Sequence, residues 1–521
     1  MRLVDFLDES PALVSGDTKF VDLDNGLSLS YRQMVNASVA IAEVLRQSGV
    51  KAEDVIATYA PNSVAAYCCI FAISRLGAVW LPLNVRNTFE ANRKQIEKSG
   101  AVKVFVDESI ATALPQIAET FPEEQLLPLN GREVLGIDLA TLSDVAGDAL
   151  AVDVKPQGEN PLVNLFATGG TTGDSKLAEW SSLSWETLVA IQDELMPAPD
   201  IPACYLVSAP MTHAAGVASF AAIRQGASVV VMDGMVPERL LRVIEEYRVT
   251  HLFLPPTAIY MLLADPAIKS HDYSSLRYFW YAAAPMSVEK LKEAIDAFGP
   301  VMVQTYGQAE APMICTSLSA ADHLFALEND RPDILRSCGK VSPHVELAIL
   351  DDDWQVLPAG QEGEIAIKGP LLMRGYYQNP QATAEIRQDG WQRTGDIGVL
   401  DEDGYLSIVD RKRDMIISGG FNVYPSEIEQ LIWGHPAIKD CAVIGIPDEK
   451  WGEQVTAVVE LKANVKAPAE QEIIQYCKEK LGSVKAPKQV LFWDELPRSP
   501  VGKVLKKEIR KVFWQDADRK I

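Results

Sequence analysis

A regular alternation of short apolar runs and helical runs limits this chain to sheets that are covered by helices. Residues 30–49 carry apolar side chains at helical spacing, with a serine at the start and a glycine at the end. An apolar run of strand length follows at 55–60, a second helical run at 63–76 and a further apolar run at 79–81. The same rhythm returns within residues 228–306. These strand–helix–strand units predict an α/β fold with mainly parallel sheets.

Length and a change of pattern along the chain predict two domains. A chain of 521 residues is longer than one hydrophobic core usually organises. Near residue 398 the rhythm changes, and the charged run 410–414 follows a short predicted strand. Residues 425–493 then hold enough helices and strands for a small domain. We therefore expect a large N-terminal domain of mainly parallel α/β subdomains at residues 1–412 and a small C-terminal α+β domain at residues 413–521.

Composition excludes several classes of partner. The chain has 48 Lys and Arg residues against 71 Asp and Glu residues, and its formal net charge of −23 argues against a nucleic-acid surface and against attraction to anionic membranes. No apolar run reaches the roughly 20 residues that cross a bilayer, and the N-terminus lacks the long apolar core of a secretory signal. The seven cysteines are scattered without a Cys-x-x-Cys pair, and no His/Cys cluster has zinc spacing. We expect a soluble cytoplasmic protein with reduced thiols; the sequence carries no sign of its oligomeric state.

One loop, residues 165–177, combines glycines, hydroxyl groups and a lysine. Its members of interest are Thr168, Gly169, Gly170, Thr171, Thr172, Gly173 and Lys176. Glycines let backbone N–H groups approach an anion closely, while the hydroxyls and the ammonium add donors and one positive charge. Asp174 and Ser175 separate the last glycine from the lysine, so the loop is not a Walker motif. Taken alone it is either an ordinary Gly/Thr turn or a polyphosphate site.

Six further segments place chemistry-bearing residues in turns and loops. They are residues 210–216, 281–285, 306–310, 390–396, 418–429 and 497–504. Within 306–310 an aromatic ring, a glycine and a carboxylate share one strand-to-loop turn, and Asp396 is able to accept two hydrogen bonds from vicinal hydroxyl groups. Taken singly, such segments are also typical of turns, strand ends or solvated charge runs. Their specificity comes from their joint occurrence in this order.

In this order the segments resemble the motifs of the adenylate-forming (ANL) superfamily and, within it, the acyl-CoA synthetase or AMP-dependent acid ligase family. The family's phosphate loop reads roughly Thr-Ser-Gly-Thr-Thr-Gly-x-Pro-Lys-Gly, from which Gly169, Ser175 and Leu177 depart. In its Tyr-Gly-x-Thr-Glu turn, Ala309 replaces the threonine. Two segments nearer the C-terminus match closely, and the resemblance covers essentially the whole chain.

For the nucleotide, the resemblance implies ATP as a substrate and Mg²⁺ as its metal. The nucleotide-binding residues it implies are Thr168, Gly169, Gly170, Thr171, Thr172, Gly173 and Lys176 at the phosphates, Ala283, Ala284 and Tyr306 at the adenine, and Asp396 and Arg411 at the ribose. Glu310 would hold the Mg²⁺, because this hard ion takes carboxylate and phosphate oxygens. The replacement at Ala309 removes a hydroxyl that contacts the α-phosphate region in the family.

For catalysis, the resemblance implies Lys503, Glu310 and His213 as the catalytic residues. The mobile ammonium of Lys503 would bridge the acyl carboxylate and the α-phosphate while charge grows in the transition state. His213 matches the position that gates the acyl pocket, and the bulky Tyr281 would shorten that pocket.

The small domain is expected to be mobile by the same resemblance. Arg413 occupies the family's hinge position. Gly419 and Gly420 belong to a loop that turns toward the large domain in relatives and forms the passage for the acceptor. We therefore expect the hinge and the acceptor face at these three residues.

The reaction implied has two steps. A small carboxylic acid attacks Mg·ATP and forms an acyl-adenylate with release of pyrophosphate, and coenzyme A then displaces AMP to give acyl-CoA. The small residues beside His213 and the bulk of Tyr281 favour a compact aryl, alicyclic or medium-chain acid. Three alternatives stay open: an amine or amino acid as acceptor, which gives an amide; the thiol of a carrier protein; and a non-catalytic nucleotide sensor, which Ala309 and Ser175 favour slightly but the retention of Lys503 does not.

Overall fold

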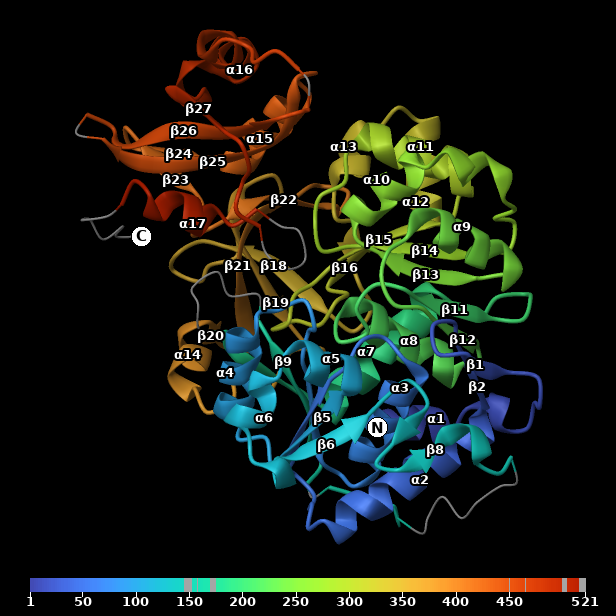
Figure 1. Ribbon diagram of the computed structural model, residues 1–521. Helices are drawn as coiled ribbons and strands as arrows, with labels where there is room; N and C mark the ends of the chain where they lie inside the picture. Colours follow the sequence, from blue (N-terminus) through green and yellow to red (C-terminus); the bar gives the residue numbers. More distant parts are fainter. Residues whose placement is uncertain are drawn as a thin grey trace.

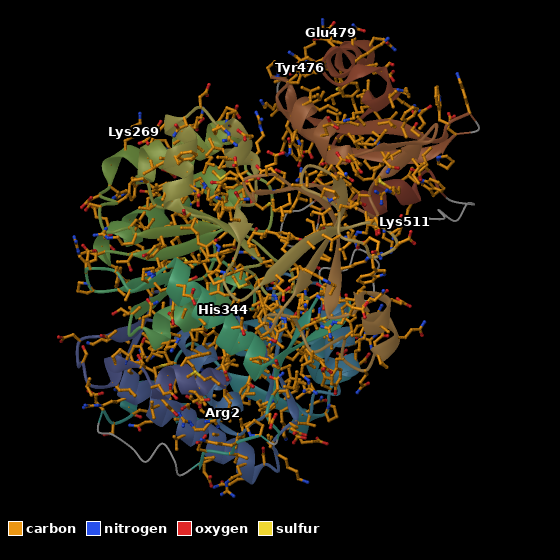
Figure 2. All side chains as sticks on the ribbon, turned by 180° about the vertical axis from the view of Figure 1, so that it is seen from behind. Arg2, Lys269, His344, Tyr476, Glu479 and Lys511 are labelled. Carbon is orange, nitrogen blue, oxygen red and sulfur yellow. The ribbon has the colours of Figure 1, made fainter. Side chains whose placement is uncertain are left out.

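In the part of the chain that it describes, the computed structural model has four β-sheets, of which three belong to a large N-terminal part and one to a smaller C-terminal domain (Figure 1). It describes residues 1–144, 152–156, 158–168, 175–448, 450–463, 465–498 and 504–514. Figure 2 shows the two ends of the molecule, with Arg2 in the N-terminal part and with Tyr476 and Glu479 in the C-terminal domain at the opposite end.

The eight-stranded sheet has the order β10-β9-β4-β3-β5-β6-β7-β8. Its strands are β3 (Val55–Tyr59), β4 (Val79–Pro82), β5 (Lys103–Asp107), β6 (Leu126–Leu129), β7 (Glu133–Val134), β8 (Ile137–Asp138), β9 (Leu162–Ala167) and β10 (Leu177–Ser181). Its helices are α3 (Val64–Arg75), α4 (Phe89–Ser99), α5 (Glu108–Ala113) and α6 (Gln116–Thr120). The five strands from β9 to β6 in this order pair in parallel, as the alternation of apolar and helical runs predicts.

The nine-stranded sheet has the order β17-β16-β15-β14-β13-β11-β12-β1-β2. Its strands are β1 (Lys19–Asp22), β2 (Leu27–Ser30), β11 (Cys204–Val207), β12 (Ser228–Val231), β13 (His251–Leu254), β14 (Tyr278–Tyr281), β15 (Met302–Tyr306), β16 (Thr316–Leu318) and β17 (Lys340–Val341). The helices in residues 1–47 and 182–336 are α1 (Leu3–Asp8), α2 (Tyr31–Gln47), α7 (Ser182–Leu195), α8 (Ala214–Arg224), α9 (Pro237–Glu246), α10 (Pro256–Ala264), α11 (Val288–Phe298), α12 (Ala320–Glu328) and α13 (Pro332–Arg336). In the order of the sheet, the six strands from β15 to β1 are parallel to one another. The strands at both edges are antiparallel to their neighbours: β2 at one edge, and β16 and β17 at the other.

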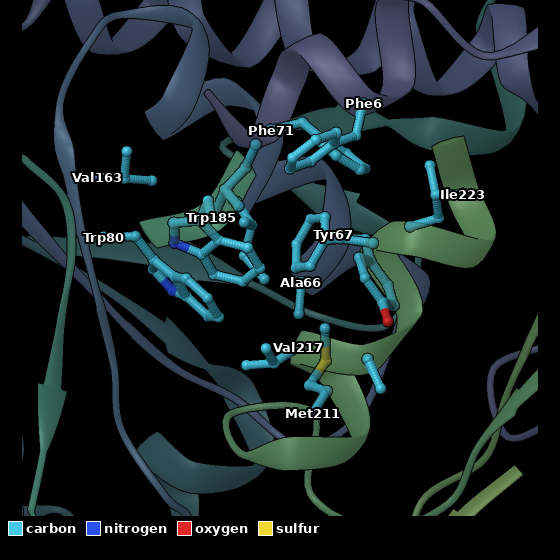
Figure 3. Packing of buried hydrophobic residues seen from close by; sticks show 14 of the residues in the cluster. Phe6, Ala66, Tyr67, Phe71, Trp80, Val163, Trp185, Met211, Val217 and Ile223 are labelled. Atoms are coloured by element: carbon cyan, nitrogen blue, oxygen red, sulfur yellow. The ribbon is translucent and has the colours of Figure 1, made fainter. Parts of the chain in front are cut away.

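The main core contains helices that are buried around their whole circumference. Every residue of α3 is buried, and so are nine of the eleven residues of α8, all but its two end residues Ala214 and Arg224. Phe71 of α3 and Phe220 of α8 meet edge to face at 6.0 Å between ring centroids. Figure 3 shows Phe6, Tyr67, Phe71 and Trp185 in this core. A helix that is apolar on all sides requires cover on all sides, which the neighbouring helices and sheets provide.

A third sheet is antiparallel, which the sequence rhythm did not predict. It contains β18 (Glu346–Leu350), β19 (Glu362–Lys368), β20 (Arg387–Gln388), β21 (Trp391–Leu400) and β22 (Leu406–Arg411), and α14 (Pro380–Glu385) precedes β20. β21, which is ten residues long, pairs with β19, β20 and β22. This sheet matters for the site, because it carries Asp396 and Arg411.

The C-terminal domain contains the fourth sheet, of order β24-β23-β26-β25 with β27 beside β26. Its elements are β23 (Ile416–Ser418), β24 (Phe421–Val423), α15 (Pro425–Trp433), β25 (Ile438–Asp448), β26 (Gly452–Leu461), α16 (Glu470–Lys485), β27 (Gln489–Trp493) and α17 (Lys506–Lys511). The expected fold, a large α/β domain followed by a small α+β domain, is confirmed. Arg413 lies in the connection between β22 of the third sheet and β23 of the fourth. The boundary at 412/413 and its mobility stay predictions.

Two further observations concern the whole described chain. Its seven cysteines are free thiols with buried side chains. Over the residues that the structure describes, no helix combines the length and the apolar character needed to cross a membrane. The short 3-10 helices in these residues are Pro11–Leu13, Glu123–Gln125, Leu139–Thr141 and Pro266–Ser270.

Candidate active site

Two neighbouring parallel strands bring the first predicted residues to one sheet edge. β14 ends at Tyr281 and β15 ends at Tyr306, and the register pairs Tyr281 with Gln304. The segments that follow these strands leave the sheet at its carboxyl edge, where open α/β sheets bind ligands. Ala283 has a φ of +74°, in the left-handed region that favours glycine, and its side chain is exposed. The turn after β14 therefore presents backbone and methyl groups outward, as a site for a flat base requires.

Three motifs that are distant in the sequence meet at Asp396. The Tyr306 hydroxyl donates a hydrogen bond of 2.6 Å to Oδ2 of Asp396, and Arg411 Nε lies 3.1 Å from Oδ1. Asp396 is 4% exposed, whereas the Arg411 side chain is 51% exposed. Burial, and after it the charge of Asp396, raise the pKa of Tyr306 well above its ordinary value, so the phenol stays a donor. The carboxylate is thus held in one orientation at the edge of solvent.

Glu310 is held through both its backbone and its side chain. Its carbonyl accepts hydrogen bonds from Gln392 Nε2 at 2.8 Å and from the Met373 amide at 3.2 Å. Its Oε1 accepts a hydrogen bond of 2.8 Å from the hydroxyl of Tyr376. Burial, and then the Glu310 charge, raise the pKa of Tyr376, so this phenol also stays protonated. Lys176 Nζ lies 4.4 Å from the centroid of the same Tyr376 ring.

An aromatic series connects His213 to the turn that carries Glu310. His213 is the N-cap residue of α8, and its ring meets Phe166 edge to face at 6.1 Å. Phe166 stacks on Trp180 at 4.6 Å, and Trp180 Nε1 donates a hydrogen bond of 2.7 Å to the carbonyl of Ala309. An acyl group beside His213 would therefore lie near Phe166, which is linked through Trp180 to the turn that carries Glu310.

The glycine-rich loop is the connection between two paired strands. β9 and β10 are antiparallel, with Ala167 opposite Leu177, and the Thr168 amide donates to the Lys176 carbonyl at 2.8 Å. Thr168 and Lys176 thus stand at the two feet of the loop. The predicted phosphate residues Gly169, Gly170, Thr171, Thr172 and Gly173 lie outside the described residues.

Comparison with known proteins decides the family. The family model described as "AMP-binding enzyme" matches residues 7–377, and the one described as "AMP-binding enzyme C-terminal domain" matches residues 427–503. The chain belongs to the AMP-binding enzyme family. Its expected membership of the adenylate-forming superfamily is confirmed.

Relatives of this AMP-binding enzyme include ligases of two kinds. It is 39% identical to medium/long-chain-fatty-acid–CoA ligase FadD8 of Mycobacterium tuberculosis over 378 residues, which are 71% of this chain and 64% of that protein. It is 34% identical to feruloyl-CoA synthase of an Amycolatopsis species over 493 residues, or 94% of each chain. The solved structure of the amide bond synthetase McbA from Marinactinospora thermotolerans is 26% identical, with a TM-score of 0.84 over 98% of this chain and 100% of that one.

Tyr281 is not brought together with His213. Successive side chains of a strand point to opposite faces of its sheet. Trp280 lies on the face covered by α8 and donates to Thr305 Oγ1 at 2.6 Å. Tyr281 is fully buried on the other face, where its hydroxyl meets Gln304 Oε1 at 3.1 Å and His323 Nε2 at 2.9 Å. Tyr281 is therefore not a wall of a pocket beside His213.

The small domain presents Gly419 and Gly420 on the turn between β23 and β24. Both have positive φ, +59° and +82°, and the Gly419 amide donates to the Trp451 carbonyl at 2.8 Å. A Cβ at Gly419 would come within 2.8 Å of the Trp451 ring, so a side chain does not fit there, whereas Gly420 faces open space. Burial, and then the nearby Arg411 charge, lower the pKa of Arg413 at the predicted hinge.

Lys503 lies outside the described residues, which end at Arg498 and resume at Val504. Arg498 and Val504 form an isolated antiparallel bridge. Arg498 is anchored to Asp440 at 2.7 Å and to Glu460 at 3.0 Å. Arg498 is therefore fixed to the fourth sheet.

The residues present fit a magnesium ion only together with a nucleotide. In the described part of the chain, no group of three or more His, Cys, Asp or Glu side chains could hold a metal by itself. Glu310 offers one carboxylate, with Oε2 lacking a hydrogen-bond partner among the described residues. One carboxylate plus phosphate oxygens is the ligand set with which Mg²⁺ is commonly held at nucleotide sites.

Sequence reasoning missed Tyr376 and Trp180. Tyr376 follows Gly375 in the loop between β19 and α14, and its only signal in the sequence is a tyrosine pair after a glycine. Trp180 lies in an apolar strand, where a buried tryptophan usually indicates core packing.

Proposed function

We propose that this AMP-binding enzyme activates a small carboxylic acid with ATP and transfers the acyl group to coenzyme A. The observation that carries the proposal is the meeting of Tyr306, Asp396 and Arg411 at the carboxyl edge of the nine-stranded sheet. A carboxylate held by a phenol and a guanidinium is an acceptor for the two vicinal hydroxyls of a ribose. Glu310 and Lys176 both contact Tyr376, one at its hydroxyl and the other over its ring, where they suit the phosphates and their cation.

In the first step, the acid's carboxylate attacks the α-phosphorus of ATP and pyrophosphate leaves. The loop after β9 and Lys176 hold the phosphates, and the ammonium of Lys503 offsets the negative charge that grows between the carboxylate and the α-phosphate. Magnesium, when bound by Glu310 and phosphate oxygens, would supply further positive charge to the departing pyrophosphate. The aromatic walls of Phe166 and Trp180 exclude water beside the carbonyl of the acid.

In the second step, the small domain rotates about the connection at Arg413 and an acceptor thiol displaces AMP. The turn at Gly419 and Gly420 supports this role, because Gly420 leaves its side open for a narrow acceptor chain. Lys503 is withdrawn by the same rotation, so that each half-reaction has its own set of small-domain residues.

The acid we propose is compact: aryl, alicyclic or of medium chain length. The ring of Phe166 beside His213, stacked on Trp180, suits an apolar or aromatic acyl group. Gly216 adds no space to the pocket, because a Cβ there would lie 1.8 Å from the Met211 carbonyl oxygen, and the glycine serves this close contact. The similarity to a feruloyl-CoA synthase and to a medium/long-chain-fatty-acid–CoA ligase supports an acid within this range.

Amide formation is the second candidate. The similarity to an amide bond synthetase over nearly all of both chains favours it. In this case the same acyl-adenylate is attacked by the nitrogen of an amine or amino acid, which gives an amide and AMP.

The test is product identification. The full chain is incubated with Mg·ATP, a panel of carboxylic acids, coenzyme A and a mixture of amino acids, and the products are identified by mass spectrometry. An acyl-CoA together with AMP supports the thioester ligase and identifies the acid. An acyl amide without acyl-CoA would overturn the thioester reading in favour of the amide ligase.

A further inference from the structure

Tyr376 lies between two opposite charges that both serve the same phosphates in the proposed function. Its hydroxyl donates to Glu310 Oε1 at 2.8 Å, and its ring lies 4.4 Å below Lys176 Nζ. Tyr376 is 8% exposed, so its ring and its hydroxyl are largely shielded from water. No motif that we identified in the sequence includes this residue.

The backbone fixes Tyr376 next to the foot of the glycine-rich loop. Tyr376 forms an antiparallel bridge with Ala178 of β10, and the Tyr377 amide donates to the Leu177 carbonyl at 2.8 Å. The Tyr376 amide itself donates to Thr383 Oγ1 at 2.9 Å. Because these contacts hold the chain on both sides of the residue, the ring is placed before any ligand binds.

The two charges do not pair with each other. Among the ion pairs of the described residues, none joins Lys176 to Glu310. A lysine ammonium over an aromatic face is attracted by the ring without losing its charge. A carboxylate that accepts one hydrogen bond from a phenol keeps its second oxygen for another partner.

We propose that Tyr376 is a positioning residue that keeps Glu310 available for the metal and Lys176 available for the phosphates. Its hydroxyl orients the carboxylate, and its ring holds the ammonium apart from it. The inference rests on the proposed function, because it presumes a nucleotide with a divalent cation at this place. The hydroxyl of Tyr376 serves metal binding, and its ring serves phosphate binding. Mutations that remove the hydroxyl alone, or the hydroxyl and the ring together, separate the two roles.

The experiment uses the full chain, Mn²⁺ as the metal probe and α,β-methylene-ATP as a nucleotide that is not cleaved. Mn²⁺ binding is measured by electron paramagnetic resonance in the presence of the nucleotide, and metal-free nucleotide binding is measured by calorimetry with a chelator. The variants are Tyr376→Phe, which keeps the ring, and Tyr376→Leu, which removes both ring and hydroxyl. Tyr377→Phe is the matched control. It removes the hydroxyl of the neighbouring tyrosine, whose side chain packs against an apolar cluster.

We expect Tyr376→Phe to weaken Mn²⁺ binding about tenfold, the effect of one hydrogen bond to a charged group, and to leave metal-free nucleotide binding within about twofold of the wild type. Tyr376→Leu is expected to weaken both. The inference is overturned if Tyr376→Phe binds Mn²⁺ as the wild type does, or if Tyr376→Leu binds the metal-free nucleotide as tightly as Tyr376→Phe does.

A double-variant cycle separates positioning from a loss of folding. In a Glu310→Gln chain, which lacks the carboxylate charge, adding Tyr376→Phe is expected to change Mn²⁺ binding less than twofold, whereas a further tenfold loss would contradict the coupling. All of these experiments measure binding and none measures product formation. The inference can therefore fail or hold independently of the proposed function. A wild-type chain that binds Mn²⁺ and nucleotide in the expected pattern but makes no acyl product would overturn only the proposed function.

Discussion

The hydroxyl of Tyr306 donates a hydrogen bond of 2.6 Å to the carboxylate of Asp396, which is 90 residues further along the chain. This contact joins the carboxyl edge of the nine-stranded sheet to the antiparallel third sheet. It explains why an antiparallel sheet is part of a site that otherwise follows the rules of parallel α/β folds.

Replacing Tyr306 by Phe is expected to weaken ATP binding about tenfold and to lower the free energy of unfolding by about 1–3 kcal/mol, because the buried Asp396 carboxylate loses one donor. The ATP dependence of the initial rate and urea denaturation measure the two effects. Tyr31→Phe is the matched control, since its buried hydroxyl also donates a bond of 2.6 Å, to the Ala227 carbonyl. The control is expected to lower stability alone, and an unchanged KM for ATP in Tyr306→Phe would contradict the assignment of Asp396.

Replacing Ala309 by Thr is expected to leave the adenylation rate unchanged or to raise it by up to about tenfold, because it restores a hydroxyl near the α-phosphate. Pyrophosphate release at saturating acid measures the rate. Ala309→Val is the control for size, since it adds similar bulk without a donor. A large loss of rate in Ala309→Thr that Ala309→Val does not share would show that the hydroxyl hinders the reaction.

Replacing Lys503 by Ala is expected to abolish acyl-adenylate formation, a loss of at least about a thousandfold, and to spare transfer from a preformed acyl-adenylate to the acceptor. The two half-reactions are measured separately, the second with chemically synthesised acyl-adenylate. Lys507→Ala removes a lysine four residues away and is expected to affect neither. Equal losses in both half-reactions of Lys503→Ala would contradict the division of labour between Lys503 and the Gly420 face.

Stability is expected to fall on acidification below pH 6.5 because two histidines are buried in the neutral form. Burial lowers the pKa of both His251 and His323 to about 4. Between pH 6.5, the pKa of an unfolded histidine, and about pH 4, the proton binds mainly to the unfolded chain. Each histidine therefore lowers the free energy of unfolding by about 2 kcal/mol between pH 6.5 and pH 5. Above pH 6.5 both states are neutral and the effect vanishes.

The variant His323→Gln tests this pH dependence. It is expected to be less stable than the wild type at pH 7, because Tyr281 and the Ser319 carbonyl lose their partner, but to lose about 2 kcal/mol less between pH 6.5 and pH 5. Urea denaturation at the two pH values measures the difference, with exposed His344→Gln as control. Equal losses in His323→Gln and the wild type would contradict the account.

Much of the fold follows from local signals in the sequence. The helical run after Ser30 forms α2, in which Ser30 and Gln33 make a capping box, and the apolar run at 55–60 forms β3. The third sheet could not be predicted in the same way. Its strands contain few long apolar runs, and β21 includes Arg393, Thr394 and Gly395, so its register depends on partners that are distant in the sequence.

Contacts between motif residues of the candidate site could be expected from the sequence, whereas contacts that depend on the tertiary structure could not. Tyr306, Asp396 and Arg411 were predicted from three motifs, and the structure brings them into contact. The direction in which Tyr281 points depends on the face of β14 that α8 covers, which the sequence does not specify. Tyr376 acquires its contact with Glu310 across 66 residues of sequence, and a tyrosine pair in a loop gives no sign of it.

The most direct test of the account is acid-dependent formation of an acyl-adenylate in the absence of any acceptor. The wild-type chain and Asp396→Asn are incubated with Mg·ATP and each carboxylic acid, and the nucleotide products are resolved by mass spectrometry. The account predicts pyrophosphate and the mass of an acyl-AMP with the wild type for at least one compact acid, and about tenfold less with the variant at subsaturating ATP. Release of ADP and phosphate, or nucleotide turnover that does not depend on the acid, would contradict it.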